Sequence, residues 1–240
     1  NGVGTGSGNG GEIHPGQLTV YGIKLILDNY GAVRLEGVPV PSKDYEQDEL
    51  PATLDVTNPP KITNIYSTNN AFAALDVNRK VHVWGRGGYG GSLPDTLDPA
   101  TDPPKITNIY STLSAFTALD VTGKVHVWGH GSYGGSLPDI LNTTPPPIIT
   151  NIYSAHSYGF AALTSDGMVV MWGKADYDKI GKNSSGEKVN VIYNVKTMSI
   201  NGHTVTATHI DGSTIEWNNI TYNNNTEIDE KYLTATAVSG

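Results

Sequence analysis

The sequence contains no cysteine among its 240 residues, which excludes disulfide bonds and any zinc or iron–sulfur site that depends on thiolate ligands. No apolar run approaches the roughly 18 residues that a membrane-spanning helix needs, so we expect no membrane insertion; no signal peptide is visible either. Basic residues are scarce, with 15 lysines and arginines against 23 carboxylates and a formal net charge of −8. A nucleic-acid-binding surface needs basic residues for its phosphate contacts, so we expect no nucleic-acid partner.

The residues that are abundant favour strands and turns. The chain has 28 glycines, 14 prolines and 13 tyrosines, together with many threonines and asparagines. β-Branched and aromatic residues are enriched in strands, whereas glycine, proline and asparagine are enriched in turns. This composition excludes a helical solenoid and predicts an all-β protein.

A tandem repeat organises the sequence. Residues 59–91 read PPKITNIYSTNNAFAALDVNRKVHVWGRGGYGG and residues 103–135 read PPKITNIYSTLSAFTALDVTGKVHVWGHGSYGG. A third copy begins at Pro146 with PPIITNIYSAHSYGFAALTSDGMVVMWG. Divergent copies at 18–37 and 197–218 flank these three, as expected of end repeats. The count is therefore about five units, with a period marked by tryptophans 44, 44 and 45 residues apart, at Trp84, Trp128, Trp172 and Trp217.

The repeat sets the expected domain boundaries. We expect residues 1–16 to form a Gly-rich flexible linker or N-terminal arm and residues 17–240 to form the repeat domain. Its units lie near 18–58, 59–102, 103–145, 146–188 and 189–231, followed by a closing strand at 232–240.

The closing strand reads YLTATAVSG, and we expect it to pair with the first unit. Pairing within the chain, which we favour, would close a small ring. Pairing with a second molecule would give an oligomer or filament, because an open strand edge recruits other chains.

Each unit reads as a series of short strands. In the second unit these are ITNIYS, AFAALD and KVHVWG, followed by a Gly-Tyr-Gly-Gly bend and a Pro- and Asp-rich connection that we expect to hold a short outer strand. The hairpin turn between the second and third strands carries glycine in most units, because glycine accepts a positive φ. Arg79 replaces this glycine in the second unit, so we expect Asn78 to adopt the left-handed conformation there.

A repeat of roughly 40–50 residues that holds three or four antiparallel strands is typical of a propeller blade. We therefore predict an all-β fold, a β-propeller of about five blades, each close to the 44-residue period. From the residues alone, the chief alternative is a row of independent hairpin modules.

The pattern I-x-x-I-Y-S…F-A-A-L…G-x-V-x-x-W-G-x-x-x-Y-G resembles RCC1-type repeats. The pattern is similar to the divergent bacterial form of this repeat, as in the RCC1-like β-lactamase inhibitory proteins and RCC1-repeat bacterial surface proteins. The resemblance covers residues 18–218 and implies RCC1-like blades whose first two strands lie near a central axis. Two departures, a connection that reads SLPD in place of N-x-x-G-Q-L-G and a unit count below that of the eukaryotic members, argue against the family's nucleotide-exchange function.

The histidines form no coherent ligand set. His82 and His126 occupy the same repeat position, but the other units carry no histidine there. A metal site with the symmetry of the repeat would need the same donor in each unit, so we interpret both as structural or surface residues. We predict no metal and no cofactor; a site missed by this reasoning would be sought among Asp95, Asp98 and Asp102. Four further histidines are expected in solvent-facing loops, namely His130, His156, His203 and His209.

No catalytic constellation is visible. Carboxylates recur after the AFAALD-type strand (Asp76, Asp120) and within SLPD (Asp95, Asp139), and a pair of carboxylates about 5–10 Å apart can hydrolyse glycosides. A residue copied from unit to unit usually serves the unit, however, so we expect Asp76 and Asp120 to cap turns by accepting backbone N–H groups. The common nucleophile, metalloprotease and nucleotide-binding motifs are missing. We predict that the protein is not an enzyme.

Recurring aromatic residues are the candidates for partner contact. Their rings can stack on sugars or anchor a protein interface, but they can equally pack between units, which is the interpretation that we favour for the tryptophans. The candidates are the tryptophans Trp84, Trp128 and Trp172 and the bend tyrosines Tyr89, Tyr133 and Tyr177.

The predicted function is a noncatalytic protein-interaction or structural module of a larger secreted or surface-exposed bacterial protein, of the adhesin or filament-forming type. The hypothesis is motivated by the Gly-rich leader, the start at Asn1 instead of Met, the Thr/Asn-rich composition, the lack of cysteine and the near-identical repeats. The alternatives are a carbohydrate-binding propeller and a protein inhibitor of an extracellular enzyme. The expected partner is thus a protein or a glycan, with self-association through the terminal strands as a further option, and the expected location is extracellular or at the cell surface.

Overall fold

The computed structural model describes residues 12–13, 15–20, 23–36, 50–54, 57–155, 158–174, 180–201, 204–218 and 226–235. Within these ranges the regular structure consists of β-strands and single-turn 3-10 helices, so the predicted all-β class is confirmed. No helix in the described part of the chain is long and apolar enough to cross a membrane.

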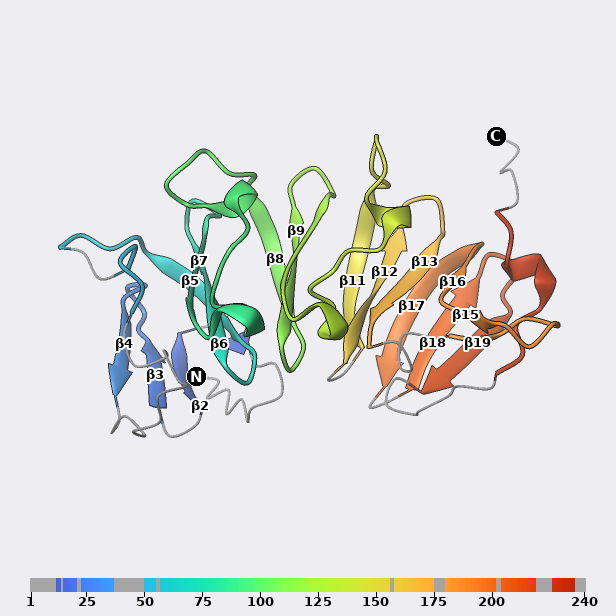
Figure 1. Cartoon of the computed structure of the whole chain (residues 1–240), viewed down its shortest axis with the longest axis horizontal. Helices are drawn as coiled ribbons and strands as arrows, with labels where there is room; N and C mark the ends of the chain where they lie inside the picture. Colours follow the sequence, from blue (N-terminus) through green and yellow to red (C-terminus); the bar gives the residue numbers. More distant parts are fainter. Residues whose placement is uncertain are drawn as a thin grey trace.

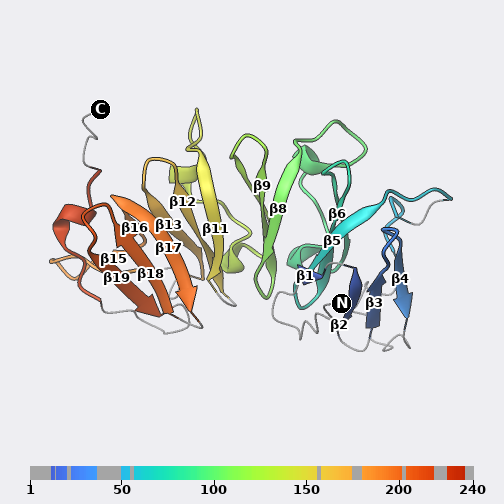
Figure 2. The same cartoon turned by 180° about the vertical axis from the view of Figure 1, so that it is seen from behind.

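Five units stand side by side in sequence order (Figures 1 and 2). Each unit is a meander of three antiparallel strands, as the repeat predicts. The strands are β2 (Gly16–Val20), β3 (Ile23–Leu27) and β4 (Val33–Glu36) in unit 1; β5 (Ile62–Ser67), β6 (Ala71–Asp76) and β7 (Val81–Gly85) in unit 2; β8 (Ile106–Ser111), β9 (Ala115–Asp120) and β10 (Val125–Gly129) in unit 3; β11 (Ile149–Ala155), β12 (Gly159–Thr164) and β13 (Val169–Gly173) in unit 4; and β17 (Val195–Asn201), β18 (Thr204–His209) and β19 (Thr214–Asn218) in unit 5.

A fourth strand is present in two of the units. In unit 4, β16 (Val191–Ile192) pairs with the outer edge of β13. In unit 2 the extra strand lies on the other side, where β1 (Glu12–Ile13) pairs with β5. This part of the predicted N-terminal linker is therefore β-structure, although residues 1–11 lie outside the described residues. The connection of unit 4 also holds a small hairpin, formed by β14 (Gly181–Lys182) and β15 (Lys188–Val189).

The outer strand expected in the connections of units 2 and 3 is replaced by 3-10 helices. These are η1 (Gly87–Tyr89) and η2 (Asp95–Leu97) in unit 2, and η3 (Gly131–Tyr133) and η4 (Asp139–Leu141) in unit 3. The physical reason is that the bend residue Gly90 is left-handed, at φ 108°, and that Pro94 has no N–H with which to join a ladder. The helices η2 and η4 instead bury one leucine each, Leu97 and Leu141.

The row of units has two edges that carry different residues. We call the edge with the hairpin turns between second and third strands the turn edge. The opposite edge, where the third strands end in Trp-Gly, is called the Trp-Gly edge. Because the strands are antiparallel, the loops between first and second strands also lie on the Trp-Gly edge.

Neighbouring units pack through apolar faces. Successive side chains of a strand point to opposite sides, so a strand between two neighbours contributes to two interfaces. In β9, Phe116 and Ala118 face unit 2, whereas Ala115 faces unit 4. One apolar cluster results between each pair of neighbouring units. Burial on both sides explains why the second strands of units 2 to 4, AFAALD, AFTALD and GFAALT, are largely apolar.

Hydrogen bonds also join the units on the turn edge. There the first strand of one unit donates its leading N–H to the carbonyl of the preceding turn, over 2.9 Å from Ile62 to Gly31, 3.0 Å from Ile106 to Arg79, 3.1 Å from Ile149 to Gly123 and 2.9 Å from Val195 to Gly167.

The aspartates at the end of the second strands cap the turns, as predicted. Asp76 Oδ1 accepts the N–H groups of Asn78 and Lys80 at 2.8 and 2.9 Å, and Asp120 does the same in unit 3. The residue that takes the left-handed conformation in unit 2 is Arg79, at φ 65°, and not Asn78. Our prediction was wrong here because the capped turn fixes which position is left-handed, whatever side chain stands there.

The two end faces of the row are polar, unlike the faces between units. In unit 1, Lys24 and Glu36 take the cross-strand positions that Phe72 and Trp84 hold in unit 2, and they form an ion pair at 3.2 Å. In unit 5 the side chains that would face a sixth unit are Ser199, Thr206, Thr208, Thr214 and Glu216. Polar outer faces are typical of end repeats that meet solvent.

The C-terminal segment also differs from the prediction. Residues 230–232 form the 3-10 helix η5 (Glu230–Tyr232) instead of starting a strand, no strand follows through residue 235, and residues 236–240 lie outside the described residues. Units 1 and 5 stand at opposite ends of the row (Figure 1), so the predicted pairing that would close a ring is not formed by the described residues. Tyr232 instead joins the apolar cluster of units 4 and 5.

Candidate functional site

The three tryptophans named as candidate contacts, Trp84, Trp128 and Trp172, lie inside the row of units, each with 4% of its surface exposed. Each ring packs against the phenylalanine opposite it, with centroids 5.0 Å apart for Phe72–Trp84 and 5.3 Å for Phe116–Trp128. The indole N–H groups of Trp128 and Trp172 donate across the unit boundary, each over 3.1 Å, to the carbonyls of Gly90 and Gly134. Trp84, Trp128 and Trp172 therefore serve packing and are not available to a partner.

Two of the bend tyrosines, Tyr89 and Tyr133, lie on the Trp-Gly edge and are half-buried. Tyr89 ends η1 and Tyr133 ends η3, while Tyr177 lies outside the described residues. Their backbone is fixed from the neighbouring loop, because Thr68 Oγ1 donates to the Tyr89 carbonyl at 3.0 Å. Thr112 Oγ1 makes the same bond to Tyr133 at 2.9 Å. The backbone that carries the two rings is thus fixed at this edge.

Aromatic and basic side chains form a continuous series of contacts along this edge. The Arg86 guanidinium lies 4.7 Å from the centroid of the Tyr89 ring, and that ring lies 5.9 Å from the His130 ring. His130 meets Tyr133 edge-on at 5.2 Å, and Tyr133 lies 5.9 Å from Tyr158. The Lys174 ammonium completes the series, 5.0 Å from the centroid of Tyr158. We call these six residues the cation–aromatic row.

The repeat itself places the basic members of the row. Arg86, His130 and Lys174 each follow a Trp-Gly dipeptide, 44 residues apart. No other unit carries a histidine at the position of His130, so a comparison of histidines alone does not reveal the series. A comparison of charge at each repeat position would have found the series. Tyr158 carried no such signal, since its counterparts are Asn70 and Ser114.

The described part of the Trp-Gly edge in units 2 to 4 contains no carboxylate. Its residues are 68–70, 86–93, 112–114, 130–137, 158 and 174. In a chain with a net charge of −8, Arg86 and Lys174 thus give the described part of this edge a positive formal charge.

His82 and His126 are buried beside the turn aspartates. His82 Nε2 donates to Asp76 Oδ2 at 3.2 Å, and His126 Nε2 donates to Asp120 Oδ2 at 2.9 Å. Burial alone would raise the pKa of Asp120, but hydrogen bonds from His126, Thr122 and the backbone outweigh it and lower the pKa below its ordinary value. The structural interpretation of these histidines is correct, and the surface alternative is wrong.

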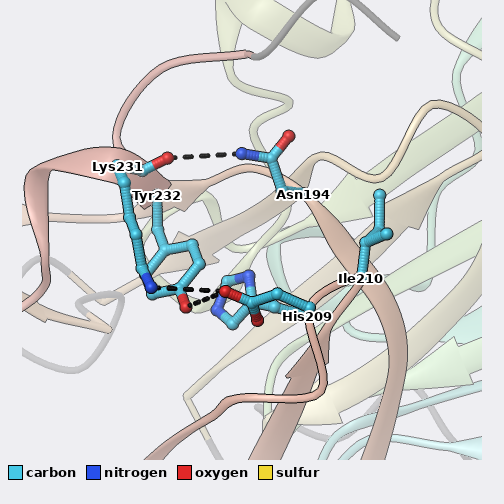
Figure 3. Close-up of a pocket in the computed structure, with 6 residues that line it drawn as sticks. Asn194, His209, Ile210, Lys231 and Tyr232 are labelled. Carbon is cyan, nitrogen blue, oxygen red and sulfur yellow. Dashed lines mark hydrogen bonds and ion pairs between the residues drawn. The ribbon is translucent and has the colours of Figure 1, made fainter.

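His209 is fully buried at the turn edge of unit 5, not in a solvent-facing loop as predicted. It lines a pocket of about 310 Å³ (Figure 3). Its ring stacks on Tyr232 with centroids 3.6 Å apart, and burial lowers the pKa of its imidazole. Nδ1 donates to the Tyr193 carbonyl at 3.1 Å.

Hydrogen bonds hold the polar rim of this pocket together. The Tyr232 hydroxyl and the Lys231 ammonium both donate to Asp211 Oδ2, at 3.0 and 3.2 Å. Hydrogen bonds from the Ser213 hydroxyl and N–H, followed by those from Tyr232 and Lys231, hold the pKa of Asp211 well below its usual range. This cluster fastens the C-terminal segment to unit 5.

No three histidine, aspartate or glutamate side chains gather into a metal-binding group in the ranges that the structure describes. Asp95, Asp98 and Asp102 do not form such a group. Metal independence stays a prediction.

No protein-family model and no curated protein matches the sequence. The fold is similar to human WBSCR16, with a TM-score of 0.51 and 15% identity over 86% of this chain and 62% of that one. The fold is that of an RCC1-like β-propeller. Other RCC1-like and WD40 structures match at lower scores. The CRINKLY WD40 ectodomain of the Arabidopsis thaliana receptor kinase ACR4 has a TM-score of 0.48 and 14% identity, over 86% of this chain and 66% of that one.

Prp20p from Saccharomyces cerevisiae, the yeast RCC1, has a TM-score of 0.44 and 17% identity, over 86% of this chain and 58% of that one. That protein has binding properties to Gsp1p and histones. The chain spans about three-fifths of the length of WBSCR16 and Prp20p. The similarity to WBSCR16 confirms the fold that the repeat pattern predicts.

Proposed function

We propose that this RCC1-like chain is a noncatalytic protein-interaction module, and that its binding site is the cation–aromatic row on the Trp-Gly edge of units 2 to 4. The single observation that carries the proposal is the row itself, in which partly exposed tyrosines and basic side chains contact one another across three units. Tyrosine and arginine are enriched among the residues that dominate protein interfaces.

The row is suited to binding because its backbone is preorganised. Thr68 and Thr112 tie η1 and η3 to the adjacent loops, and Gly90 packs beneath, on the Phe116 ring. Side chains held in place before binding lose little conformational entropy when a partner docks. A rigid edge that repeats one motif in successive units therefore offers a partner several equivalent contacts.

The carbohydrate-binding alternative has weaker support. Stacking on a sugar ring needs an open aromatic face, and the tryptophans are buried. Tyr133 has rings on two sides, His130 and Tyr158. The inhibitor alternative is a special case of protein binding and is tested with it.

We also propose that the module belongs to a larger secreted or surface-exposed protein of the adhesin or filament-forming type. The near-identity of units 2 and 3 supports this, because it indicates recent duplication. Antibody or biotin labelling of intact cells of the source organism would test the location, and labelling only after lysis would contradict it.

The binding site can be tested by comparing two variants of the purified protein. Tyr89→Ala combined with Tyr133→Ala removes two rings of the row, whereas Tyr30→Ala removes a tyrosine that is 85% exposed on the turn edge. A photo-crosslinking residue in place of the exposed Ser132 marks what contacts the row. We expect wild type and Tyr30→Ala to crosslink the same protein from extracts of the source organism and its neighbours, and the double variant to lose it. Equal crosslinking by all three folded proteins would refute the site.

A further inference from the structure

We infer that the partner presents an extended acidic peptide segment to the cation–aromatic row, and that this segment runs across units 2, 3 and 4. The inference rests on the proposed function and specifies the chemistry of the partner. It follows from the charge, the hydrogen-bond donors and the length of the row.

Charge is the first argument. Arg86 is exposed and His130 is half-buried, and the described residues of this edge in units 2 to 4 include no carboxylate that would compete for them. The chain as a whole is acidic, with a formal net charge of −8. A segment that carries carboxylates along its length is therefore attracted to the cations of this edge, which favours a position along the row.

The donors are the second argument. The planar guanidinium of Arg86 lies over the Tyr89 ring, an arrangement that leaves the N–H groups at its rim able to bind a carboxylate with two parallel hydrogen bonds. His130 Nδ1 accepts the Ser132 N–H at 3.3 Å, so the proton of the neutral ring is on Nε2. Nε2 is therefore a donor, which suits a carboxylate oxygen. Lys174 adds a third cation beside Tyr158.

The length is the third argument. The row has five steps, none longer than 5.9 Å, so its ends lie less than about 30 Å apart. An extended chain advances about 3.3 Å per residue and spans that distance with about nine residues. The tyrosines between the cations supply apolar contact to the aliphatic part of such a chain. A short acidic strand, rather than a folded domain surface, matches this narrow site.

The experiment measures binding of a fluorescein-labelled ten-residue peptide with alternating glutamate and serine, at low ionic strength, by fluorescence anisotropy. We expect Arg86→Gln to weaken binding about tenfold, in keeping with the loss of a charge-assisted hydrogen bond. His130→Lys should tighten it, because it adds a fixed charge at a position where unit 4 already carries lysine. Lys61→Gln, which removes an exposed lysine from the turn edge, should leave binding unchanged. Melting temperatures confirm that each variant is folded.

Three outcomes would overturn the inference. Equal losses for Arg86→Gln and Lys61→Gln would show attraction by charge alone. Equal binding of the peptide with glutamine in place of glutamate would show that carboxylates are not recognised. Tighter binding of a sulfated oligosaccharide or an oligonucleotide of the same charge would assign the row to another polyanion. If the tyrosine pair is required for partner crosslinking while Arg86→Gln leaves peptide binding intact, the acidic partner is refuted and the binding site stands.

Discussion

Substitution of Gly134 by alanine tests how tightly successive units are joined. Gly134 has a φ of +105°, and a Cβ there would lie 2.5 Å from Phe160 Cδ2, far closer than van der Waals contact. The left-handed conformation costs a non-glycine residue about 1–2 kcal/mol, and overpacking of a rigid core adds about 1–3 kcal/mol. We therefore expect the free energy of unfolding to fall by about 2–5 kcal/mol. For a chain of this size, a loss of about 3 kcal/mol lowers the melting temperature by roughly 6–12 °C.

Gly212→Ala is the matched control. Gly212 also has a positive φ, +84°, but a Cβ there meets no heavy atom within 4 Å. The free energy of unfolding of Gly212→Ala should therefore fall only by the cost of the left-handed conformation, about 1–2 kcal/mol. Differential scanning calorimetry of the two variants separates the steric term from the backbone term. If Gly134→Ala melts no lower than Gly212→Ala, the bend glycine is not wedged against the next unit, and our account of the inter-unit packing is wrong.

Three further predictions concern the same repeated contacts. Trp128→Phe should destabilise the protein by about 1–2 kcal/mol more than Trp84→Phe in denaturant titrations, because Trp128 Nε1 donates to the buried Gly90 carbonyl and Trp84 Nε1 has no partner among the described residues; equal losses would contradict this. The folded-state pKa of Asp120 is lowered, so its stabilising effect is present above the unfolded pKa and is lost as the pH falls through the folded value. The stability advantage of wild type over Asp120→Asn should accordingly shrink below about pH 4 in acid titrations, and an advantage independent of pH would refute this. EDTA should leave the melting temperature unchanged, and a drop of many degrees would reveal a metal site.

Much of each unit could be predicted from the sequence because its strands and turns depend on local pattern. Alternation in ITNIYS, the capping aspartates Asp76 and Asp120 and the turn glycines all act over a few residues. The connections were predicted less well. Pro94 and the left-handed Gly90 replace an outer strand by 3-10 helices, a choice that depends on how the connection lies on the next unit.

The errors at the C-terminus have the same origin. The segment that starts at Tyr232 alternates like a strand, and an alternating pattern describes any segment with one apolar side. The side chain of Tyr232 is instead buried in the cluster between units 4 and 5, where it stacks on His209. His209 was expected in solvent because it precedes a turn. It is buried because Tyr232, 23 positions later in the chain, covers it, and a local pattern does not reveal such a contact.

The sequence by itself determined the repeat, the strand pattern and the five-unit count, because a 44-residue period with alternating strands admits few folds. Only the tertiary structure decided which recurring aromatic residues face solvent. Trp128 and Tyr133 are five positions apart and equally regular in the repeat. Trp128 is buried against Phe116 and bonded to the preceding unit, whereas Tyr133 lies between His130 and Tyr158 at the edge. Whether a side chain is exposed depends on whether the neighbouring unit covers it, and the sequence pattern of one unit does not show this.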